Sequence, residues 1–159
     1  MESCDGSAAR DYARNYRLFF WMFSRFEYAL KQVGFVIWKA EGDEVKIDWG
    51  KFTKEPNTSK AFEALKKVPE ADYIIANPPK KRIKIGTSLD WRVVAAAKNA
   101  TDLCGSLRRL RNNLFHGDKG HPSSVRDRDL LQSGLVALDA MIQALKPVKE
   151  AFEHDLDMA

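Results

Sequence analysis

The residue types best suited to chemistry lie in the segment Arg111-Asn112-Asn113-Leu114-Phe115-His116-Gly117. Arginine is a permanent cation whose planar guanidinium matches the geometry of a phosphate group. Histidine is the side-chain type whose ordinary pKa lets it accept and donate a proton near neutral pH. Arg111 and His116, with four residues between them, therefore predict phosphodiester chemistry on RNA.

RNA hydrolysis without a metal needs a base for the ribose 2′-OH, an acid for the leaving 5′-oxygen and a cation for the charged transition state. His116 can serve as either acid or base, and Arg111 can supply the cation. One histidine cannot readily do both jobs. A two-fold dimer that places two Arg/His pairs in one cleft would supply both. Asn112 or Asn113 would hold the scissile phosphate or orient the imidazole.

Other chemistries have little support in the sequence. No set of His, Cys, Asp and Glu has the spacing of metal ligands, and there is no glycine-rich phosphate loop. We therefore expect no metal and no cofactor, and we interpret His121 and His154 as surface residues.

The cysteine count and the apolar runs indicate an intracellular, cytoplasmic protein. Cys4 and Cys104 are the only cysteines, too few for a disulfide framework or a thiolate cluster within one chain. Cys104 is predicted to be a small core residue. The longest apolar run, residues 18–23, is too short to span a membrane, and the first residues do not resemble a secretory signal.

Positive charge is concentrated in one part of the chain, although the net charge is only +4. Residues 1–79 are balanced, residues 80–126 carry 11 basic and 3 acidic side chains, and residues 127–159 have a net charge of −4. The segment with a net charge of +8 contains the Arg/His pair, as a polyanion site would require. The alternative is that the cluster over residues 80–84 is a solvated loop.

Helical periodicity is clearest near the start of the chain. Apolar residues recur at helical spacing over about residues 10–33, and Gly34 follows as a natural C-terminal cap. Trp21 and Tyr28 fall opposite this stripe. A helix that is apolar on two sides usually packs on both, so we expect a second partner there, such as another copy of the chain.

Glu27 lies at the shoulder of the same stripe and must find a partner, because an unpaired buried carboxylate is costly. One interpretation is a structural salt bridge to an arginine. The other is that Glu27 positions a catalytic group across a helix interface.

The middle of the chain, about residues 35–89, gives weaker signals. Glu41-Gly42-Asp43 indicates a turn, and residues 45–49 alternate as a short strand would. Residues 57–59 offer N-cap candidates for a helix over about 60–67, which Pro69 ends. We expect an irregular insertion here, with the Lys/Arg cluster in an extended region after Asn77-Pro78-Pro79.

Two further long helices are predicted. One runs from Leu89 or Asp90 to Phe115, with a leucine stripe at 103, 107, 110 and 114. The other covers about residues 127–153, and Pro147 bends or restarts it. The expected fold is a single all-α domain over residues 1–159, an antiparallel four-helix-type bundle.

A helical wheel places the candidate residues around the leucine stripe. Arg111 falls about 80° to one side of the stripe and Asn113 about 80° to the other. Asn112 and His116 lie on the far side, with Arg108 one turn further back. At the helix C-terminus the macrodipole should favour the protonated form of His116.

The helix ending in Arg-Asn-Asn-Leu-Phe-His-Gly, followed by Asp-Lys, resembles the signature of the HEPN superfamily. That signature is an arginine, four to six residues often led by a polar one, then a histidine. Residues 23–31, Phe-Ser-Arg-Phe-Glu-Tyr-Ala-Leu-Lys, are also similar to bacterial HEPN proteins. The likeness covers about residues 108–119 and the first long helix. It is absent over residues 35–89.

The resemblance implies a helical bundle and a homodimer whose paired motifs line one cleft. It implies metal-independent endoribonuclease activity that leaves a 2′,3′-cyclic phosphate, often in toxins or anti-phage defence. Arg111 and His116 match the family's functional pair and Asn112 its polar residue, and Glu27 is a looser match. Together with Glu27, the expected substrate-binding residues are Arg108, Asn113 and Lys119.

Two other classes of function remain open. One is a non-catalytic RNA- or nucleotide-binding module, whose affinity would fall with salt. The other is a scaffold or antitoxin-type partner whose aromatic first helix binds another protein.

Overall fold

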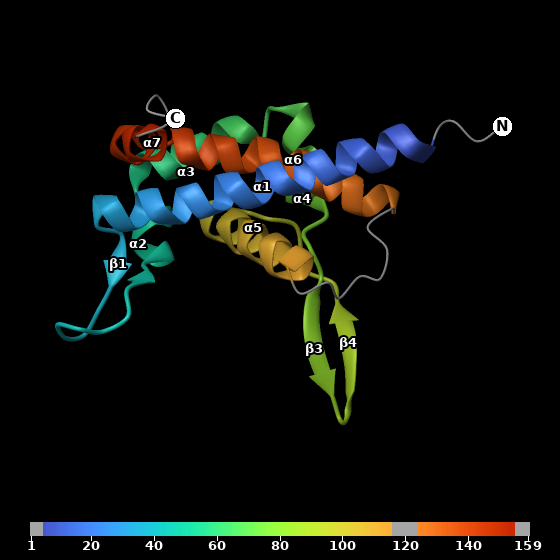
Figure 1. Ribbon diagram of the computed structural model, residues 1–159, viewed down its shortest axis with the longest axis horizontal. Helices are drawn as coiled ribbons and strands as arrows, with labels where there is room; N and C mark the ends of the chain where they lie inside the picture. The colour runs from blue at the N-terminus through green and yellow to red at the C-terminus, as the bar shows by residue number, and fades with distance from the viewer. Residues whose placement is uncertain (1–4, 116–123, 155–159) are drawn as a thin grey trace.

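Residues 5–115 and 124–154 are described by the computed structural model, and they form seven α-helices, one 3-10 helix and two two-stranded sheets (Figure 1). The expectation of a mostly helical fold is therefore confirmed. The two small antiparallel sheets were not expected in an all-α bundle.

The first helix, α1 (Asp5–Val33), follows its predicted stripe closely. Phe19, Phe23, Phe26 and Leu30 are fully buried, because their spacing places them on one side of the helix. The helix ends where predicted, and Gly34 adopts a φ of 94°, a conformation that glycine tolerates without strain.

The second apolar side of α1 is partly covered by α7 (Lys146–Glu153) of the same chain. Trp21 meets the edge of Phe152 with ring centroids 5.8 Å apart, although 46% of Trp21 is still exposed. Nη2 of Arg25 donates to the carbonyls of Phe152 (2.8 Å) and His154 (2.7 Å), at the C-terminal end of α7. The aromatic second side of α1 therefore does not by itself require a second copy of the chain.

Three leucines of the predicted stripe, at 103, 107 and 110, are buried on α5 (Ala100–Phe115), and Leu114 is partly buried. The last helix begins as α6 (Val125–Gln143), with Ser124 as its N-cap. The chain then restarts as α7, with Pro147 in its first turn. The predicted restart at Pro147 is confirmed, because proline suits a helix start and disrupts a helix interior.

Helix α5 crosses α1 obliquely, with the opposite chain direction. The Tyr16 hydroxyl donates to the Leu114 carbonyl (3.4 Å), whereas Glu27, three turns further along α1, reaches back to Arg111.

Helices α1 and α6 run in the same direction and pack together (Figure 1). Tyr12 and Arg128 line one pocket, and further along both helices Phe19 lies beside Gly134. The antiparallel arrangement expected for the bundle therefore does not hold for α1 with α6.

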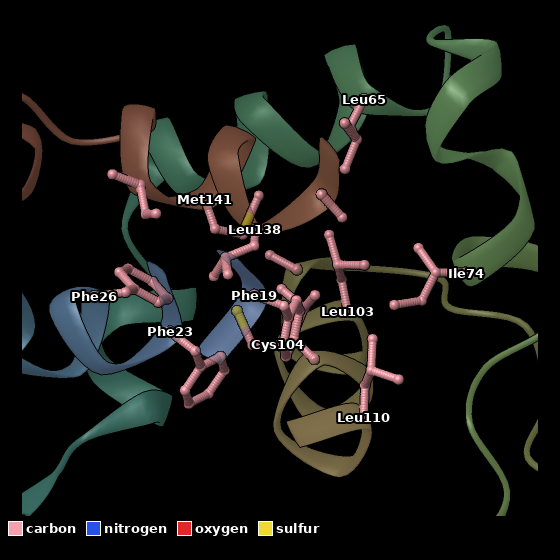
Figure 2. Close-up of a cluster of buried hydrophobic side chains, with 14 of the residues drawn as sticks. Phe19, Phe23, Phe26, Leu65, Ile74, Leu103, Cys104, Leu110, Leu138 and Met141 are labelled. Atoms are coloured by element: carbon pink, nitrogen blue, oxygen red, sulfur yellow. The ribbon is translucent and has the colours of Figure 1, made fainter. Parts of the chain in front are cut away.

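The expectation that residues 35–89 are irregular is wrong. After the short pair β1 (Val36–Ile37) and β2 (Lys46–Ile47), the chain forms α2 (Trp49–Thr53), α3 (Pro56–Leu65), η1 (Pro69–Ala71) and α4 (Asp72–Ala76). These elements contribute buried side chains to the common core, among them Phe52, Phe62, Leu65 and Ile74. Figure 2 shows Leu65 and Ile74 in the same cluster as Leu103 and Leu110 of α5 and Leu138 of α6. Helices of five to ten residues are too short to give a clear apolar period.

Local details of this region differ from the predictions. Helix α3 begins at Pro56 with Glu55 as N-cap, not at residues 57–59, because proline is favoured at the first helical position. The predicted strand over 45–49 shrinks to Lys46–Ile47, and Trp49 begins α2. The turn at Glu41-Gly42-Asp43 is confirmed.

A β-hairpin covers residues 81–92: its first strand confirms the extended conformation expected for the Lys/Arg cluster, and its second strand lies where the start of a long helix was expected. Strands β3 (Lys81–Ile85) and β4 (Ser88–Arg92) pair in register around Gly86, whose φ of 58° suits a two-residue turn. The predicted helix start at Leu89 or Asp90 is therefore wrong, and α5 begins at Ala100. Cross-strand pairing outweighs helix propensity in this segment.

Candidate functional site

Arg111 and Glu27 form an ion pair that joins α5 to α1. Nη1 of Arg111 lies 3.4 Å from Oε1 and 3.5 Å from Oε2 of Glu27, so the guanidinium meets both carboxylate oxygens. The side chains are 30% and 26% exposed, respectively. Arg111 leaves the helix beside the leucine stripe, as the wheel predicted, and so emerges at the boundary between core and solvent. The interpretation of Glu27 as a partner for an arginine is confirmed.

The face of the Arg111 guanidinium lies on an aromatic ring. Its Cζ is 4.9 Å from the centroid of the Phe23 ring, within the range of a cation–π contact. The Nε atom is buried and has no hydrogen-bond partner among the described residues. Buried donors without a partner are rare in folded proteins. Ring, carboxylate and helix together fix the orientation of this cation.

Arg108 lies one turn before Arg111 on α5, over a second aromatic ring. Its Cζ is 5.1 Å from the Trp49 ring of α2, and the guanidinium is exposed. Trp49 in turn packs against Phe23 (6.1 Å) and Phe26 (5.8 Å). The short helix α2 thus extends the aromatic surface of α1 beneath two arginines. Two such cations a turn apart can contact successive phosphates of one strand.

The two asparagines of the motif have different surroundings. Asn112 is exposed, on the outer face of α5. Asn113 donates from Nδ2 to the carbonyl of Lys80 (3.1 Å), on the chain that enters the hairpin. This contact gives Asn113 a structural role that its sequence position did not suggest. The substrate-binding role predicted for it stays a prediction.

His116 and Lys119 lie outside the described residues, as does His121. The structure therefore places the arginine half of the predicted site and not the histidine half. His154, at the end of α7, is exposed, as predicted.

The hairpin is attached to the same part of α5 that carries Arg111. Three successive carbonyls, those of Pro78, Pro79 and Lys80, accept hydrogen bonds from side chains. Arg126 of α6 donates to Pro78 (3.2 Å) and Arg109 of α5 to Pro79 (3.2 Å). Desolvation lowers the pKa of the Arg109 guanidinium, which is held between helix and hairpin.

The sequence did contain a signal for this hairpin. Two runs containing β-branched or aromatic residues, 81–85 and 88–92, flank a Gly-Thr pair, which is a recognised hairpin pattern.

A shallow pocket lies at the N-terminal ends of α1 and α6, away from Arg111. It is lined by Ala8, Asp11, Tyr12, Asn15, Arg128, Leu131 and Gln132. Burial, with a contribution from Asp127, raises the pKa of Tyr12 to about 12. At neutral pH this phenol is therefore a hydrogen-bonding group and not a base.

Cys104 is fully buried in the core, as predicted, and burial raises the pKa of its thiol to about 12 (Figure 2). A thiol that stays protonated is a poor nucleophile. Over the ranges 5–115 and 124–154, no group of three His, Cys, Asp or Glu side chains is placed to hold a metal ion. Within the same ranges, no helix has the length and apolar character needed to cross a membrane.

Comparison with protein-family models, curated proteins and solved structures finds no match to this chain.

Proposed function

We propose that this protein is a metal-independent endoribonuclease of the HEPN type, acting as a homodimer and serving as a toxin or defence effector. The observation that carries the proposal is the environment of Arg111. It is a cation oriented by Glu27 and Phe23 and only partly exposed, and it lies five residues before a histidine. The concentration of basic residues in the same segment supports a polyanionic substrate.

In the proposed reaction the ribose 2′-oxygen loses its proton to one imidazole and attacks the adjacent phosphorus. The bond from phosphorus to the 5′-oxygen breaks, and that oxygen takes a proton from a second imidazole. The products are a 2′,3′-cyclic phosphate and a 5′-hydroxyl end. Arg111 stabilises the negative charge that builds on the non-bridging oxygens.

Two imidazoles require two copies of the chain, because each copy brings one His116. For both Arg/His pairs to face one phosphate, the two-fold axis must pass near the C-terminal end of α5. Sedimentation of the purified protein tests this requirement, and a strict monomer at all concentrations would remove the acid/base pair.

The central test is cleavage of mixed-sequence RNA in EDTA. We expect wild-type protein to cleave RNA and to leave cyclic phosphate ends. Arg111→Ala and His116→Ala should each reduce cleavage by at least about a hundredfold, as expected for loss of transition-state charge stabilisation or of an acid/base group.

Asn112→Ala tests the polar residue that follows Arg111 in the motif. Arg17 is an exposed arginine of α1, and Arg17→Ala is the matched control. Melting curves should show that each variant is folded. Cleavage that appears only with added metal, or that survives His116→Ala, contradicts the proposal.

A second candidate function is a non-catalytic RNA-binding module. It is favoured by the pairing of Arg111 with Glu27, which offsets part of the charge that catalysis would use. This candidate predicts RNA binding that weakens with salt and forms no product.

A further inference from the structure

The β3–β4 hairpin extends away from the helices (Figure 1). Most of its strand residues are exposed. Only Ile83 and Trp91 of its ten strand residues are partly buried. Ile85 and Leu89 are 54% and 62% exposed. A two-stranded hairpin without a packed face is at best marginally stable in water. Its stability must therefore come from its attachment to the helices.

That attachment is specific. The side chains of Arg109, Asn113 and Arg126 bind the three carbonyls at residues 78–80, immediately before β3. On the other side of the hairpin, the Ala97 amide donates to the carbonyl of Ile75 (2.9 Å). The hairpin is thus fixed relative to α5, the helix that carries Arg108 and Arg111.

The register of the strands sorts the side chains into two faces. Arg82 pairs with Trp91, and Lys84 pairs with Leu89, so these four residues share one face, which we call the Trp91 face. The guanidinium of Arg82 lies over the Trp91 ring, with Cζ 4.7 Å from the centroid. Lys81 and Arg92 pair with each other on the opposite face.

The charge of the hairpin is strongly positive. Residues 80–92 contain five basic side chains and one acidic one, a net charge of +4 that equals the net charge of the whole chain. A cluster of cations spaced along a ribbon attracts a polyanion. An aromatic ring among them adds a surface on which an unpaired base can stack. A neutral protein partner would leave most of these charges unpaired.

We propose that the β3–β4 hairpin is an arm that binds single-stranded RNA. Arg82 and Lys84 on the Trp91 face contact phosphates, Lys81 adds positive charge from the opposite face, and an unpaired base stacks on Trp91 in place of the Arg82 guanidinium. The RNA strand continues from the hairpin toward Arg108 and Arg111 on α5. The choice of RNA as the polymer rests on the proposed function, and the arm deepens that proposal by assigning a substrate class and a binding surface.

The test measures binding separately from cleavage. The probe is a fluorescent 12-nucleotide 2′-O-methyl RNA, which has no 2′-OH to attack and so stays intact. We compare wild type with Lys81→Ala/Arg82→Ala/Lys84→Ala by fluorescence anisotropy. We expect the triple variant to bind at least about tenfold more weakly, with the slope of log affinity against log salt reduced by about 2.

The matched control removes the same charge elsewhere. Lys54, Lys60 and Lys67 are exposed cations on or next to α2 and α3, and changing all three to alanine gives the same net charge. The control triple should bind within about twofold of wild type. Equal losses in the two triples would show that only total charge matters and would overturn the proposal.

The role of Trp91 has its own test. Trp91→Leu keeps an apolar side chain and removes the stacking surface, so we expect about tenfold weaker binding to the single strand. Binding to a duplex of the same length should change little. A variant that binds the single strand like wild type, or a wild type that prefers the duplex, contradicts a stacking arm.

Two further results separate this proposal from the proposed function. Binding that depends on the hairpin, with no RNA cleavage, would support the arm and contradict the nuclease. RNA cleavage with an unchanged KM in the hairpin triple would support the nuclease and overturn the arm. If the triple changes the oligomeric state and not RNA affinity, the hairpin is a protein interface and the arm is wrong.

Discussion

Arg111 combines an ion pair with Glu27 and a cation–π contact with Phe23 at the candidate site. Glu27 partly neutralises the charge of Arg111, and the Phe23 ring and the helix hold its guanidinium in place. A carboxylate that touches a phosphate-binding arginine repels the phosphate but also fixes the guanidinium. In the proposed enzyme, Glu27 therefore acts as a positioning residue for Arg111.

Glu27→Gln removes the negative charge and keeps the shape of the side chain. We expect tighter RNA binding, by about threefold, because the phosphate no longer competes with a carboxylate for Arg111. We expect slower cleavage at saturating RNA, by about tenfold, because the guanidinium is less well oriented. Single-turnover kinetics over a range of RNA concentrations separates the two effects.

Tyr28, an exposed neighbour on α1, provides the control through Tyr28→Phe. A Glu27→Gln variant in which affinity and rate both match wild type would leave Glu27 as a structural ion pair only. Because both partners are partly exposed, the ion pair itself should contribute about 1 kcal/mol or less to stability.

At the scale of elements, α5 connects three parts of the molecule. Its leucines face the core, Arg111 reaches α1, and Arg109 and Asn113 hold the chain that enters the hairpin. Arg109 and Asn113 thus face the hairpin, whereas Arg111, between them in the sequence, faces α1. The hairpin and the candidate site are therefore positioned by the same two turns of helix.

Arg109→Ala/Asn113→Ala should loosen the hairpin without unfolding the helices. Each side chain donates one hydrogen bond to a carbonyl, and such bonds contribute about 1 kcal/mol each. We expect trypsin to cut after residues 80–84 several times faster than in wild type, with a melting temperature only a few degrees lower. Mass spectrometry of the early fragments locates the cuts.

Asn112→Ala is the matched control, because Asn112 lies beside Asn113 and is exposed. It should be cut at the wild-type rate. If the double variant is also cut at that rate, the contacts of Arg109 and Asn113 with the carbonyls of Pro79 and Lys80 do not hold the hairpin.

At the scale of the whole molecule, one core joins the ends of the chain to its middle. Phe19 of α1, Ile74 of α4, Leu103 of α5 and Leu138 of α6 belong to the same buried cluster (Figure 2). Cys104 lies within it, and Tyr12 lies where α1 meets α6. Ionisation of either group inside the fold would place a charge where water solvates it less well than in the unfolded chain.

Stability should therefore fall at alkaline pH. Burial raises the pKa of Cys104 from 9.0 to about 12 and that of Tyr12 from 10.0 to about 12, whereas both ionise at their ordinary values in the unfolded chain. The folded state thus holds its protons longer, and its advantage is complete below pH 9 and lost between pH 9 and about 12. The loss is at most about 1.4 kcal/mol per pH unit for each group.

Urea unfolding from pH 8 to pH 11 measures this loss. Cys104→Ala should lower stability at pH 8 by leaving a small cavity but flatten the decline between pH 9 and 10. In a Cys4→Ser background, Ellman's reagent should not react with the native protein at pH 8 and should react fully in urea. Rapid reaction of the native protein would mean that Cys104 is accessible.

The long periodic segments were readily predicted, and the short ones were not. Gly34, the leucines of α5 and the restart at Pro147 follow from rules that act within one or two turns. Glu27 was expected to pair with an arginine because a carboxylate at the shoulder of an apolar stripe needs a counter-charge. The helix predicted over about residues 60–67 is present as α3, whereas the start of α5 and the helices α2 and α4 were missed, because they depend on cross-strand pairing and on packing against other helices.

The sequence by itself determined the amphipathic helices, the position of Arg111 at the edge of the core and the concentration of charge over residues 80–126. These properties depend on the order of residues along a helix or on simple composition. Only the tertiary structure decided that Arg111 meets Glu27 and Phe23, and that α5 and α6 hold the hairpin by three carbonyls. Those contacts join residues far apart in the chain, and no local pattern specifies which distant carbonyl or ring a side chain will reach.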